Sequence, residues 1–492
     1  MSISNFIKRA RDIMRMDAGI NGDAQRIEQL TWMIFLKVYD AAETDWEIME
    51  DDYESIIPDQ FRWRNWANTD NEHGLKGDEL LNFVNNDLFP ALKNIDIPAS
   101  CPVRKSVVKA VFTDIHNYMK DGAYLRMLME LINEVNFTDP VESHAFGEIY
   151  ETILKGLQSA GSAGEFYTPR ALTDFMAEHV NLKLGDQVAD FACGTGGFLN
   201  SARKQLEPIA LKGTVGDREI LSHSFHGIEK KPLPYLLCIT NMLLNGVESP
   251  DIRHGNSLTK DVDSYGEKDK FDVILMNPPY GGSERAEIQN NFPSSMKSSE
   301  TADLFIVLIM YRLKLGGRAA VVVPDGFLFG SGNKTEIKKA LFSKFNVHTI
   351  IRLPTSVFAP YTSIATNIIF FDNTGENTKE IWFYRVDMPE GYKHFSKTKP
   401  IKLEHLNELR NWWNHRSEKQ INGSNKVKKY TVEEIKGCDY NLDLCGYPQE
   451  QEEILPPREL IERYQAARTA HEKKMDEALS KILAMIGEGH ES

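Results

Sequence analysis

The stretch Phe271–Gly282, with the sequence FDVILMNPPYGG, holds the residues best suited to chemistry. Its apolar first half predicts a buried strand that stops at Asn277-Pro278-Pro279-Tyr280. The two prolines fix φ and push Asn277 into an extended conformation, which leaves the Pro278 carbonyl free to accept a hydrogen bond. The Asn277 amide oxygen and this carbonyl suit an exocyclic amine with two hydrogens, and Tyr280 offers a ring for stacking. The pattern therefore predicts a site for a nucleobase amine, with a plain strand and Pro-Pro turn as the alternative.

A glycine-rich turn follows another predicted strand, Asp186–Phe191, and opens a helix. Glycines let a ligand approach the backbone closely, and the N–H groups at the start of a helix can bond a carboxylate. Asp190, at the strand end, favours a cationic group on the same ligand. An amino acid fits these two features better than a pyrophosphate does, and a tight turn without a ligand is the alternative. The predicted cofactor contacts are Asp190, Gly194, Thr195, Gly196 and Gly197.

Polar residues also end the neighbouring predicted strands. Phe225–Glu229 ends in an acid, as strands that bind ribose hydroxyls do, although a solvated strand end is the plain alternative. Ile252–Leu258 places Asn256 where its amide could contact an adenine ring. Because strands alternate with helices here, we expect a parallel doubly wound sheet with ligands beyond the carboxyl ends of its strands. The polar residues at such ends are Asp190, Glu229, Asn256 and Asn277.

A short aromatic segment, GEFYTPR at 164–170, precedes the first of these strands. Thr168 suits the N-cap of a helix that has Pro169 at its first position. The two aromatic rings and the cap hydroxyl could also lie over a bound cofactor, with ordinary helix capping as the alternative. The predicted cofactor contacts here are Glu165, Phe166, Tyr167 and Thr168.

A second aromatic segment joins two strands predicted at His348–Leu353 and Ala365–Phe371, whose short connection permits antiparallel pairing. Within it, Phe358 or Tyr361 could present a ring to the face of a base opposite Tyr280. Core packing is the alternative for either ring.

Three regions of the chain differ in periodicity. Residues 1–155 carry apolar residues at helical spacing and predict a helical N-terminal domain, for packing, docking or DNA contact. Strands and helices alternate over residues 156–448. Residues 449–492 predict a helical tail with a narrow apolar seam that suits a partner helix, and packing on its own domain is the alternative. The seam residues are Leu460, Tyr464, Ala467, His471, Met475, Ala478 and Ile482.

Three polar stretches of the middle region lack clear periodicity. Gly281–Thr301 predicts a lid or a DNA-contacting loop, with disorder as the alternative. Lys393–Lys402 and the linker-like Asn422–Lys426 are candidates for phosphate contact, and a solvated surface is the more common meaning of such stretches.

The composition limits the possible classes of protein. With 492 residues, 41% hydrophobic and 26% charged, the chain is long enough for two or three domains. No run approaches the roughly 18 apolar residues of a membrane span, and MSISNFIKRA lacks a signal peptide's apolar segment, so we expect a cytoplasmic protein. Five scattered cysteines predict reduced thiols and no metal site. The net charge of −14 implies either that a basic partner binds the nucleic acid or that nucleic acid is not the substrate.

Taken in order, these motifs resemble those of the modification subunit (HsdM type) of type I restriction-modification enzymes, an N6-adenine DNA methyltransferase. The resemblance covers nearly the whole chain. It rests on FLK at 35–37, GEFYTPR at 164–170, DFACGTGGF at 190–198, GIEKK at 227–231 and NPPY at 277–280. Two positions depart from the family pattern, because Asn256 stands where many methyltransferases have an acid and Tyr280 stands where the family commonly has Phe.

The resemblance implies S-adenosylmethionine as methyl donor, a specificity subunit that reads the DNA, a restriction subunit and a second copy of the modification subunit. The expected fold is α/β, a Rossmann-like methyltransferase sheet that is mostly parallel with an antiparallel strand, between the helical N-terminal domain and the helical tail. The expected reaction is methylation of the N6 of an adenine flipped out of DNA. Its catalytic residues would be Asn277, Pro278, Pro279 and Tyr280. The rival functions are methylation of a protein glutamine amide, which also has two hydrogens on nitrogen, and a scaffold subunit without catalysis.

Overall fold

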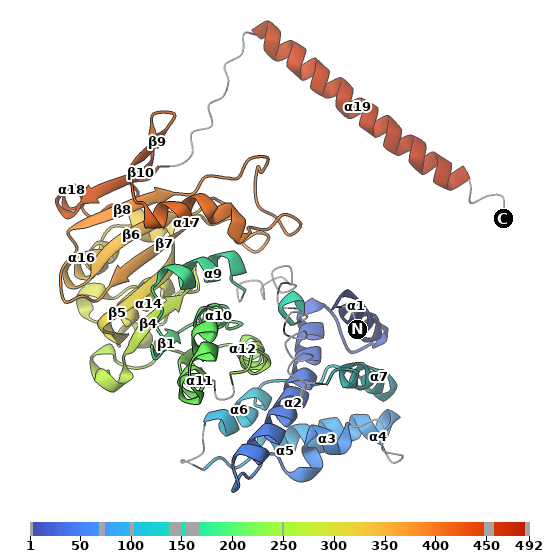
Figure 1. The fold of residues 1–492 in the computed structure, drawn as a ribbon. Coiled ribbons are helices and arrows are strands. Elements are labelled where there is room, and N and C mark those ends of the chain that lie inside the picture. The colour runs from blue at the N-terminus through green and yellow to red at the C-terminus, as the bar shows by residue number, and fades with distance from the viewer. Residues whose placement is uncertain are drawn as a thin grey trace. The chain divides into compact units, whose positions relative to one another are not determined.

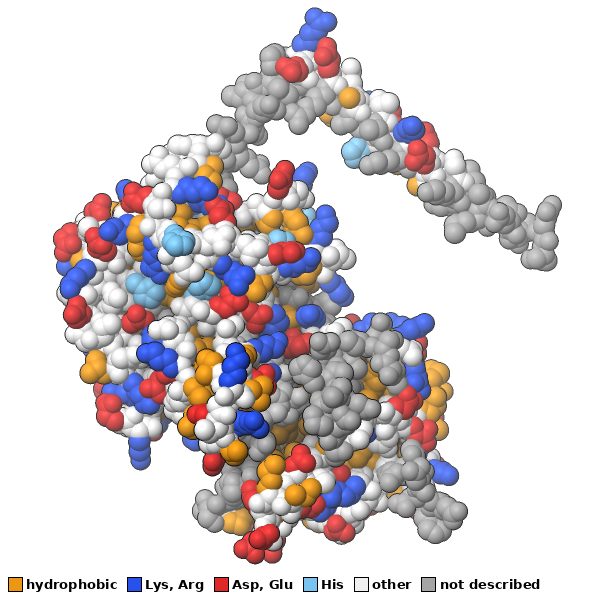
Figure 2. Space-filling view, in the orientation of Figure 1, with side chains coloured by type: hydrophobic (Ala, Val, Ile, Leu, Met, Phe, Trp, Pro, Cys, Tyr) orange, Lys and Arg blue, Asp and Glu red, His pale blue; other side chains and the backbone are white. Residues whose placement is uncertain are grey.

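The chain forms two compact units, Met1–Gly446 and Tyr447–Ser492, in the computed structural model (Figure 1). The structure describes residues 3–67, 74–98, 103–136, 147, 150–153, 155, 167–247, 250–446 and 457–487. The first unit holds a set of helices followed by a sheet, and the second holds a long helix. On the face drawn in Figure 2, basic and acidic side chains are interspersed. No helix within the described ranges is long and apolar enough to cross a membrane.

The helical region is built around α2 (Asp23–Met49), which is apolar on more than one side because other helices pack around it. Trp32, Phe35 and Tyr39 of α2 are fully buried. The helix begins at Asp23, directly after Gly22. The other elements are α1 (Ile3–Met16), the 3-10 turn η1 (Asp59–Phe61), α3 (Trp63–Trp66), α4 (Gly77–Asn82), the π-helical η2 (Phe83–Leu88), α5 (Phe89–Lys93), α6 (Val103–Phe112) and α7 (Gly122–Asn133).

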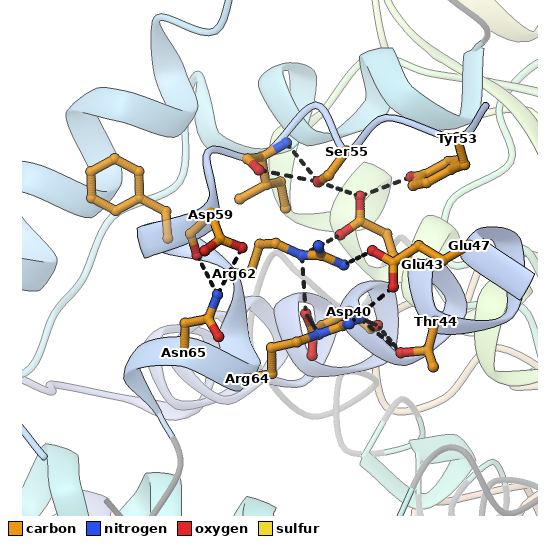
Figure 3. Close-up of polar contacts among 12 residues, drawn as sticks. Asp40, Glu43, Thr44, Glu47, Tyr53, Ser55, Asp59, Arg62, Arg64 and Asn65 are labelled. Carbon is orange, nitrogen blue, oxygen red and sulfur yellow. Dashed lines mark hydrogen bonds and ion pairs between the residues drawn. The ribbon is translucent and has the colours of Figure 1, made fainter. Parts of the chain in front are cut away.

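A network of hydrogen bonds and ion pairs holds the segment 53–65, which follows α2, against that helix (Figure 3). The Glu43 side chain is fully buried, and its Oε1 accepts hydrogen bonds from the hydroxyls of Tyr53 (2.8 Å) and Ser55 (2.6 Å). Burial raises the pKa of the Glu43 carboxyl. Arg62 Nε lies 3.5 Å from Glu43 Oε2, and the other ion pairs of the network join Arg62 and Arg64 to Asp40 and Glu47. The network therefore fixes the path of the chain from α2 into α3.

Ten described strands form one sheet in the order β3-β2-β1-β4-β5-β7-β6-β8-β10-β9. Strands β1 to β5 pair in parallel, and so do β6 and β8, whereas β7 and β10 run opposite to their neighbours. The antiparallel pairing predicted around residues 354–361 is that of β6 with β7. The strands are β1 (Val188–Asp190), β2 (Phe225–Glu229), β3 (Asp251–His254), β4 (Phe271–Met276), β5 (Leu313–Pro324), β6 (Asn346–Arg352), β7 (Thr366–Asp372), β8 (Glu380–Arg385), β9 (Lys419–Ile421) and β10 (Ser424–Thr431).

Helices cover both faces of the sheet, because alternate residues of its central strands face two separate cores. Val273 and Leu275 of β4 belong to a core that contains residues of α9, α10, α12 and the N-terminal helices. Ile274 and Met276 belong to a second core with α14 and α16. The helices are α9 (Arg170–His179), α10 (Gly197–Lys212), α11 (Val215–Ser222), α12 (Pro232–Leu244), α13 (Ala286–Gln289), α14 (Thr301–Arg312), α15 (Asp325–Phe329), α16 (Asn333–Lys344), α17 (Asn407–Asn414) and α18 (Val432–Gly437).

Two polar stretches are more ordered than their composition predicts. Asn422 and Gly423 form the turn of the β9–β10 hairpin with φ of 53° and 74°, the left-handed values that a two-residue hairpin turn favours. The linker interpretation of this stretch is therefore wrong. The segment after Gly281 closes on itself, because Ser283 pairs with Glu300 in a β-bridge, and the alternative of disorder is wrong there.

The second unit contains α19 (Pro457–Gly487), which confirms the predicted helical tail. Its exposed large apolar side chains are Ile461, Tyr464, Met475 and Leu479. The side chains of the predicted seam residues Leu460, Ala467 and Ile482 lie outside the part of the tail that the structure describes.

Candidate active site

A pocket of about 400 Å³ opens at the carboxyl ends of β1, β2, β3 and β4. The polar residues predicted at the strand ends line it together, where ligands of a parallel sheet bind: Asp190, Glu229, Asn256 and Asn277. The remaining predicted residues in its wall are Tyr167, Thr168, Gly194, Thr195, Gly197, Pro278, Pro279, Tyr280, Phe358 and Tyr361. Glu165 and Phe166 lie outside the described residues.

The turn between β1 and α10 owes its shape to glycines. Gly194 and Gly196 have φ of 53° and 77°, which L side chains rarely adopt. The Gly194 N–H donates to Glu229 Oε2 (2.9 Å), so the turn is tied to the end of β2. Gly196 lies against Cys238 of α12, since a Cβ on this glycine would be 2.9 Å from the Cys238 Sγ. The turn therefore packs tightly on its outer side and presents its backbone to the pocket.

Two buried acids line the pocket. Asp190 is 1% exposed and Glu229 is 6% exposed. Burial raises the pKa of Asp190 well above its usual range, and burial also raises the pKa of Glu229 against backbone hydrogen bonds that lower it. A cation beside Asp190 would restore its ionised form. Glu229 Oε1 accepts from the Lys231 N–H (2.8 Å), and a carboxylate has further lone pairs for hydroxyl groups. The residues therefore fit a ligand with an ammonium group at the turn and hydroxyls near β2.

Arg170 joins three parts of the site. Its Nη2 lies 2.7 Å from Glu151 Oε1, and its guanidinium carbon lies 4.9 Å from the centre of the Tyr167 ring. A Cβ on Gly197 would lie 2.0 Å from Arg170 Nη1, so a side chain at Gly197 would displace the arginine. Arg170 therefore supports the Tyr167 ring and the start of α10 from behind the pocket.

Asn277 follows β4 and is bound at both ends of its amide. Its Nδ2 donates to Thr168 Oγ1 (3.1 Å), and its Oδ1 accepts from the Tyr280 hydroxyl. Thr168 is not the N-cap of a helix, so that prediction is wrong. Pro169 is the N-cap, with extended dihedrals (φ −52°, ψ 129°) and no side-chain hydrogen bond, and α9 begins at Arg170.

The aromatic residues of the pocket contact one another. The rings of Tyr280 and Phe358 meet edge to face, with 6.0 Å between their centres. Phe358 is 4% exposed and belongs to the core as well as the pocket wall, whereas Tyr361 is partly exposed. Burial raises the pKa of the Tyr280 phenol, which therefore stays protonated and donates. Phe358 thus supports the ring of Tyr280, and Tyr361 lies nearby in the wall.

Other residues of the wall carry weaker sequence signals. Gly255 and Ser257 flank Asn256, and the Ser257 hydroxyl donates to the Phe191 carbonyl (2.6 Å). The sequence places both within the strand predicted at Ile252–Leu258, but β3 ends at His254, so they belong to the loop that lines the pocket. Phe305 lies within the apolar helix α14, where its direct neighbours Leu304 and Ile306 are apolar, so the sequence does not mark it as a pocket residue.

Comparison with known proteins identifies the family. The N-6 DNA Methylase family matches residues 141–454, and the HsdM N-terminal domain matches residues 3–132. The chain belongs to the N-6 DNA methylase family. A similar relative is the EcoEI type I restriction enzyme methylase subunit of Escherichia coli, 49% identical over 468 residues, which are 94% of this chain and 94% of the relative.

Solved structures agree with this assignment. A modification subunit of a putative type I restriction enzyme from Vibrio vulnificus YJ016 is 42% identical, with a TM-score of 0.76 over 88% of this chain and 92% of the other. A chain from a study of complex assembly and conformational transition of the type I R-M system is 35% identical, with a TM-score of 0.80 over 100% of this chain and 99% of the other. The resemblance to type I modification subunits and the α/β methyltransferase fold are therefore confirmed.

Proposed function

We propose that this N-6 DNA methylase is the modification subunit of a type I restriction-modification enzyme and methylates the N6 of adenine in a specific DNA sequence. The observation that carries the proposal is the placement of Asn277, Pro278 and Tyr280 in the wall of the pocket that Asp190 and Glu229 also line. An acceptor pair for an amine thus lies beside a site that fits an amino acid and a ribose. These intact groups argue against a scaffold without catalysis.

S-adenosylmethionine, when bound, supplies a methyl group activated by a sulfonium. We assign its amino acid part to Asp190, Gly194 and Thr195, because a buried acid suits an ammonium and a helix start suits a carboxylate. Glu229 is assigned to the ribose hydroxyls. Asn256 is assigned to the adenine ring, and its Oδ1 accepts from the Leu258 N–H (3.0 Å), which fixes the orientation of its amide. The remaining proposed contacts are Glu165, Phe166, Tyr167, Thr168, Gly196 and Gly197, of which Tyr167, Thr168 and Gly197 line the pocket.

The adenine N6 is a poor nucleophile because its lone pair is delocalised into the ring. Inside a duplex it is also inaccessible, so the base must be flipped into the pocket. Asn277 Oδ1 and the Pro278 carbonyl would accept its two hydrogens, which concentrates electron density on the nitrogen. The Tyr280 ring would stack on the base. Dipoles that are oriented before the reaction stabilise the positive charge that develops on N6 without reorganisation, and no general base is needed before transfer.

The charge of the chain bears on its partners. A protein at −14 binds DNA weakly by itself, and its basic and acidic side chains are interspersed on the face of Figure 2. A specificity subunit therefore holds and reads the duplex, in a cytoplasmic complex that also contains a second modification subunit and a restriction subunit. Lys393–Lys402 is the proposed local phosphate contact.

Three functional domains follow from this proposal. Residues 1–155 form the helical domain, residues 156–448 bind the cofactor and transfer the methyl group, and residues 449–492 attach the chain to the specificity subunit. The exposed apolar side chains of α19 support the last assignment, because they suit a partner helix.

Transfer of labelled methyl groups tests the proposal. The chain is co-expressed with its specificity subunit, incubated with labelled S-adenosylmethionine and duplex DNA, and the DNA is hydrolysed to nucleosides. We expect the label in N6-methyladenine. Label in a protein glutamine would support the rival transferase, and cofactor binding without transfer to either substrate would support a scaffold.

A further inference from the structure

The amide of Asn277 forms hydrogen bonds with two hydroxyl groups from different parts of the chain. Thr168 accepts from Nδ2 at 3.1 Å and precedes Asn277 by 109 residues, while Tyr280 donates to Oδ1 from the same turn. An asparagine amide can present either its oxygen or its NH2 group to a ligand, and its terminal torsion has broad minima. Both hydroxyl groups can donate or accept, and in this structure they hold the amide with Nδ2 toward Thr168 and Oδ1 toward Tyr280. The orientation in which the amide is held decides what the pocket can bind.

Only one orientation of this amide suits an amine that carries two hydrogens. An NH2 group turned toward the amine would oppose donors to donors, whereas the oxygen accepts. In the structure the oxygen lies on the side of Tyr280, the ring assigned to stacking. The amide oxygen has two lone pairs, so it can accept from an amine as well as from the Tyr280 hydroxyl.

We propose that Thr168 is a positioning residue for the methyl transfer, whose hydroxyl holds the Asn277 Nδ2 and thereby turns Oδ1 toward the amine of the base. This inference rests on the proposed function of the same site. The segment at 164–170 would then orient Asn277 in addition to contacting the cofactor.

The local backbone supports this role for the hydroxyl. Thr168 precedes the N-cap Pro169, and no side-chain hydrogen bond caps α9, so this hydroxyl is not used to start the helix. The neighbouring Tyr167 is 4% exposed beneath the Arg170 guanidinium, which anchors the backbone on which Thr168 sits. The Thr168 hydroxyl is therefore held at a fixed place beside the end of β4.

The test compares Thr168→Val, which keeps the shape and removes the hydroxyl, with Thr168→Ser, which keeps the hydroxyl. Each variant is assembled with the specificity subunit. The rate of a single turnover is measured at saturating S-adenosylmethionine and DNA, and the cofactor Kd is measured by calorimetry. We expect Thr168→Val to slow transfer about tenfold with a much smaller change in the cofactor Kd, and Thr168→Ser to restore most of the rate.

Thr214→Val is the matched control. The Thr214 hydroxyl accepts from the Asp217 N–H (3.3 Å) at the start of α11 and is exposed away from the pocket. The same hydroxyl donates to Asp217 Oδ2 (2.8 Å), so this variant also loses a threonine hydroxyl and its hydrogen bonds, and we expect an unchanged rate of transfer.

Several outcomes would overturn the positioning role. They are a Thr168→Val rate equal to the wild-type rate, a Thr168→Ser rate as low as that of Thr168→Val, or a loss of cofactor affinity that accounts for the whole defect. If the wild-type chain labelled protein glutamine instead of DNA, the proposed function would fail. The same comparison of variants would then be made on the protein substrate, because a glutamine amide also requires the Asn277 oxygen.

Discussion

Arg170 and Glu151 form a largely buried, bidentate ion pair that links the helical region to the wall of the pocket at the strand ends. Arg170 Nε lies 2.8 Å from Glu151 Oε2, and Nη2 lies 2.7 Å from Oε1. The two side chains are only 13% and 15% exposed. Because the same guanidinium lies over Tyr167 and against Gly197, a change in the pair is transmitted to the wall of the pocket.

We expect Glu151→Ala to destabilise the chain by about 3 kcal/mol, because it leaves the Arg170 charge buried without its partner. The affinity for S-adenosylmethionine should fall as well, since Tyr167 and the start of α10 lose their support. Chemical denaturation and calorimetry measure the two effects. Stability equal to wild type would contradict the role of the pair.

The pair Arg9–Glu134 provides the matched control for Glu151→Ala. This pair is also bidentate, with Arg9 Nη1 2.9 Å from Glu134 Oε2 and Nη2 2.8 Å from Oε1. Its side chains, however, are 45% and 42% exposed. Glu134→Ala should leave stability and cofactor affinity unchanged, because water replaces the lost contact.

The stabilisation that the buried pair Arg170–Glu151 provides should also depend on pH. Burial raises the pKa of the Glu151 carboxyl, but the charge and hydrogen bonds of Arg170 outweigh burial, so the pKa in the folded chain is lowered. The pair therefore stabilises the folded chain above the pKa that Glu151 has in the unfolded chain. This stabilisation is lost as the pH falls through the folded-state pKa.

The strand ends of the pocket were predictable because they follow local rules. Apolar runs end at Asp190, Glu229 and Asn277, and parallel strands bring such ends to one edge of the sheet. The hydrogen bond between Thr168 and Asn277 was not predictable, because the two residues are 109 positions apart and spacing alone favours a helix cap at Thr168.

The outer part of the sheet was missed for a different reason. Strand β10 carries several lysines, and its alternation of buried and exposed residues is weak, while β9 has only three residues. The Asn422-Gly423 turn signal was present, but the surrounding polar composition led to the linker interpretation.

Replacement of Asn277 should separate catalysis from cofactor binding. We expect Asn277→Ala to reduce methyl transfer about 100-fold or more, because the amine loses one of its two acceptors in the transition state. The affinity for S-adenosylmethionine should stay close to that of the wild type. Asn411→Ala, on an exposed asparagine of α17, is the control. A parallel loss of cofactor binding would count against the role assigned to Asn277.

The glycine turn gives a complementary prediction. Gly194→Val should abolish cofactor binding, because a branched side chain would occupy the space assigned to the methionine part and would be strained at φ of 53°. Gly246→Val is the matched control, since Gly246 also has a positive φ (75°) but an added Cβ there meets nothing within 4 Å. The backbone strain in Gly246→Val should lower the free energy of unfolding by about 1 to 2 kcal/mol and leave the affinity for S-adenosylmethionine intact. Unchanged affinity of Gly194→Val in calorimetry would contradict the assignment.

Helix α19 carries apolar side chains that are exposed to water. Ile461, Tyr464, Met475 and Leu479 are 56%, 68%, 64% and 52% exposed, and Ile461 and Met475 lie two heptads apart, as residues of a helix seam do. Helices of a partner that pack on this seam would bury them, and a chain at −14 needs such a partner to hold DNA.

We therefore expect deletion of all residues after Leu455 to leave cofactor binding intact but to prevent assembly with the specificity subunit, and so to abolish site-specific methylation. Co-purification and methyl transfer to DNA containing the site measure the two losses. The paired change Tyr464→Glu with Met475→Glu should weaken assembly in the same way without shortening the chain, because it places charges on the seam. The interpretation of the tail would be wrong if the truncated chain still co-purified with that subunit and methylated its site.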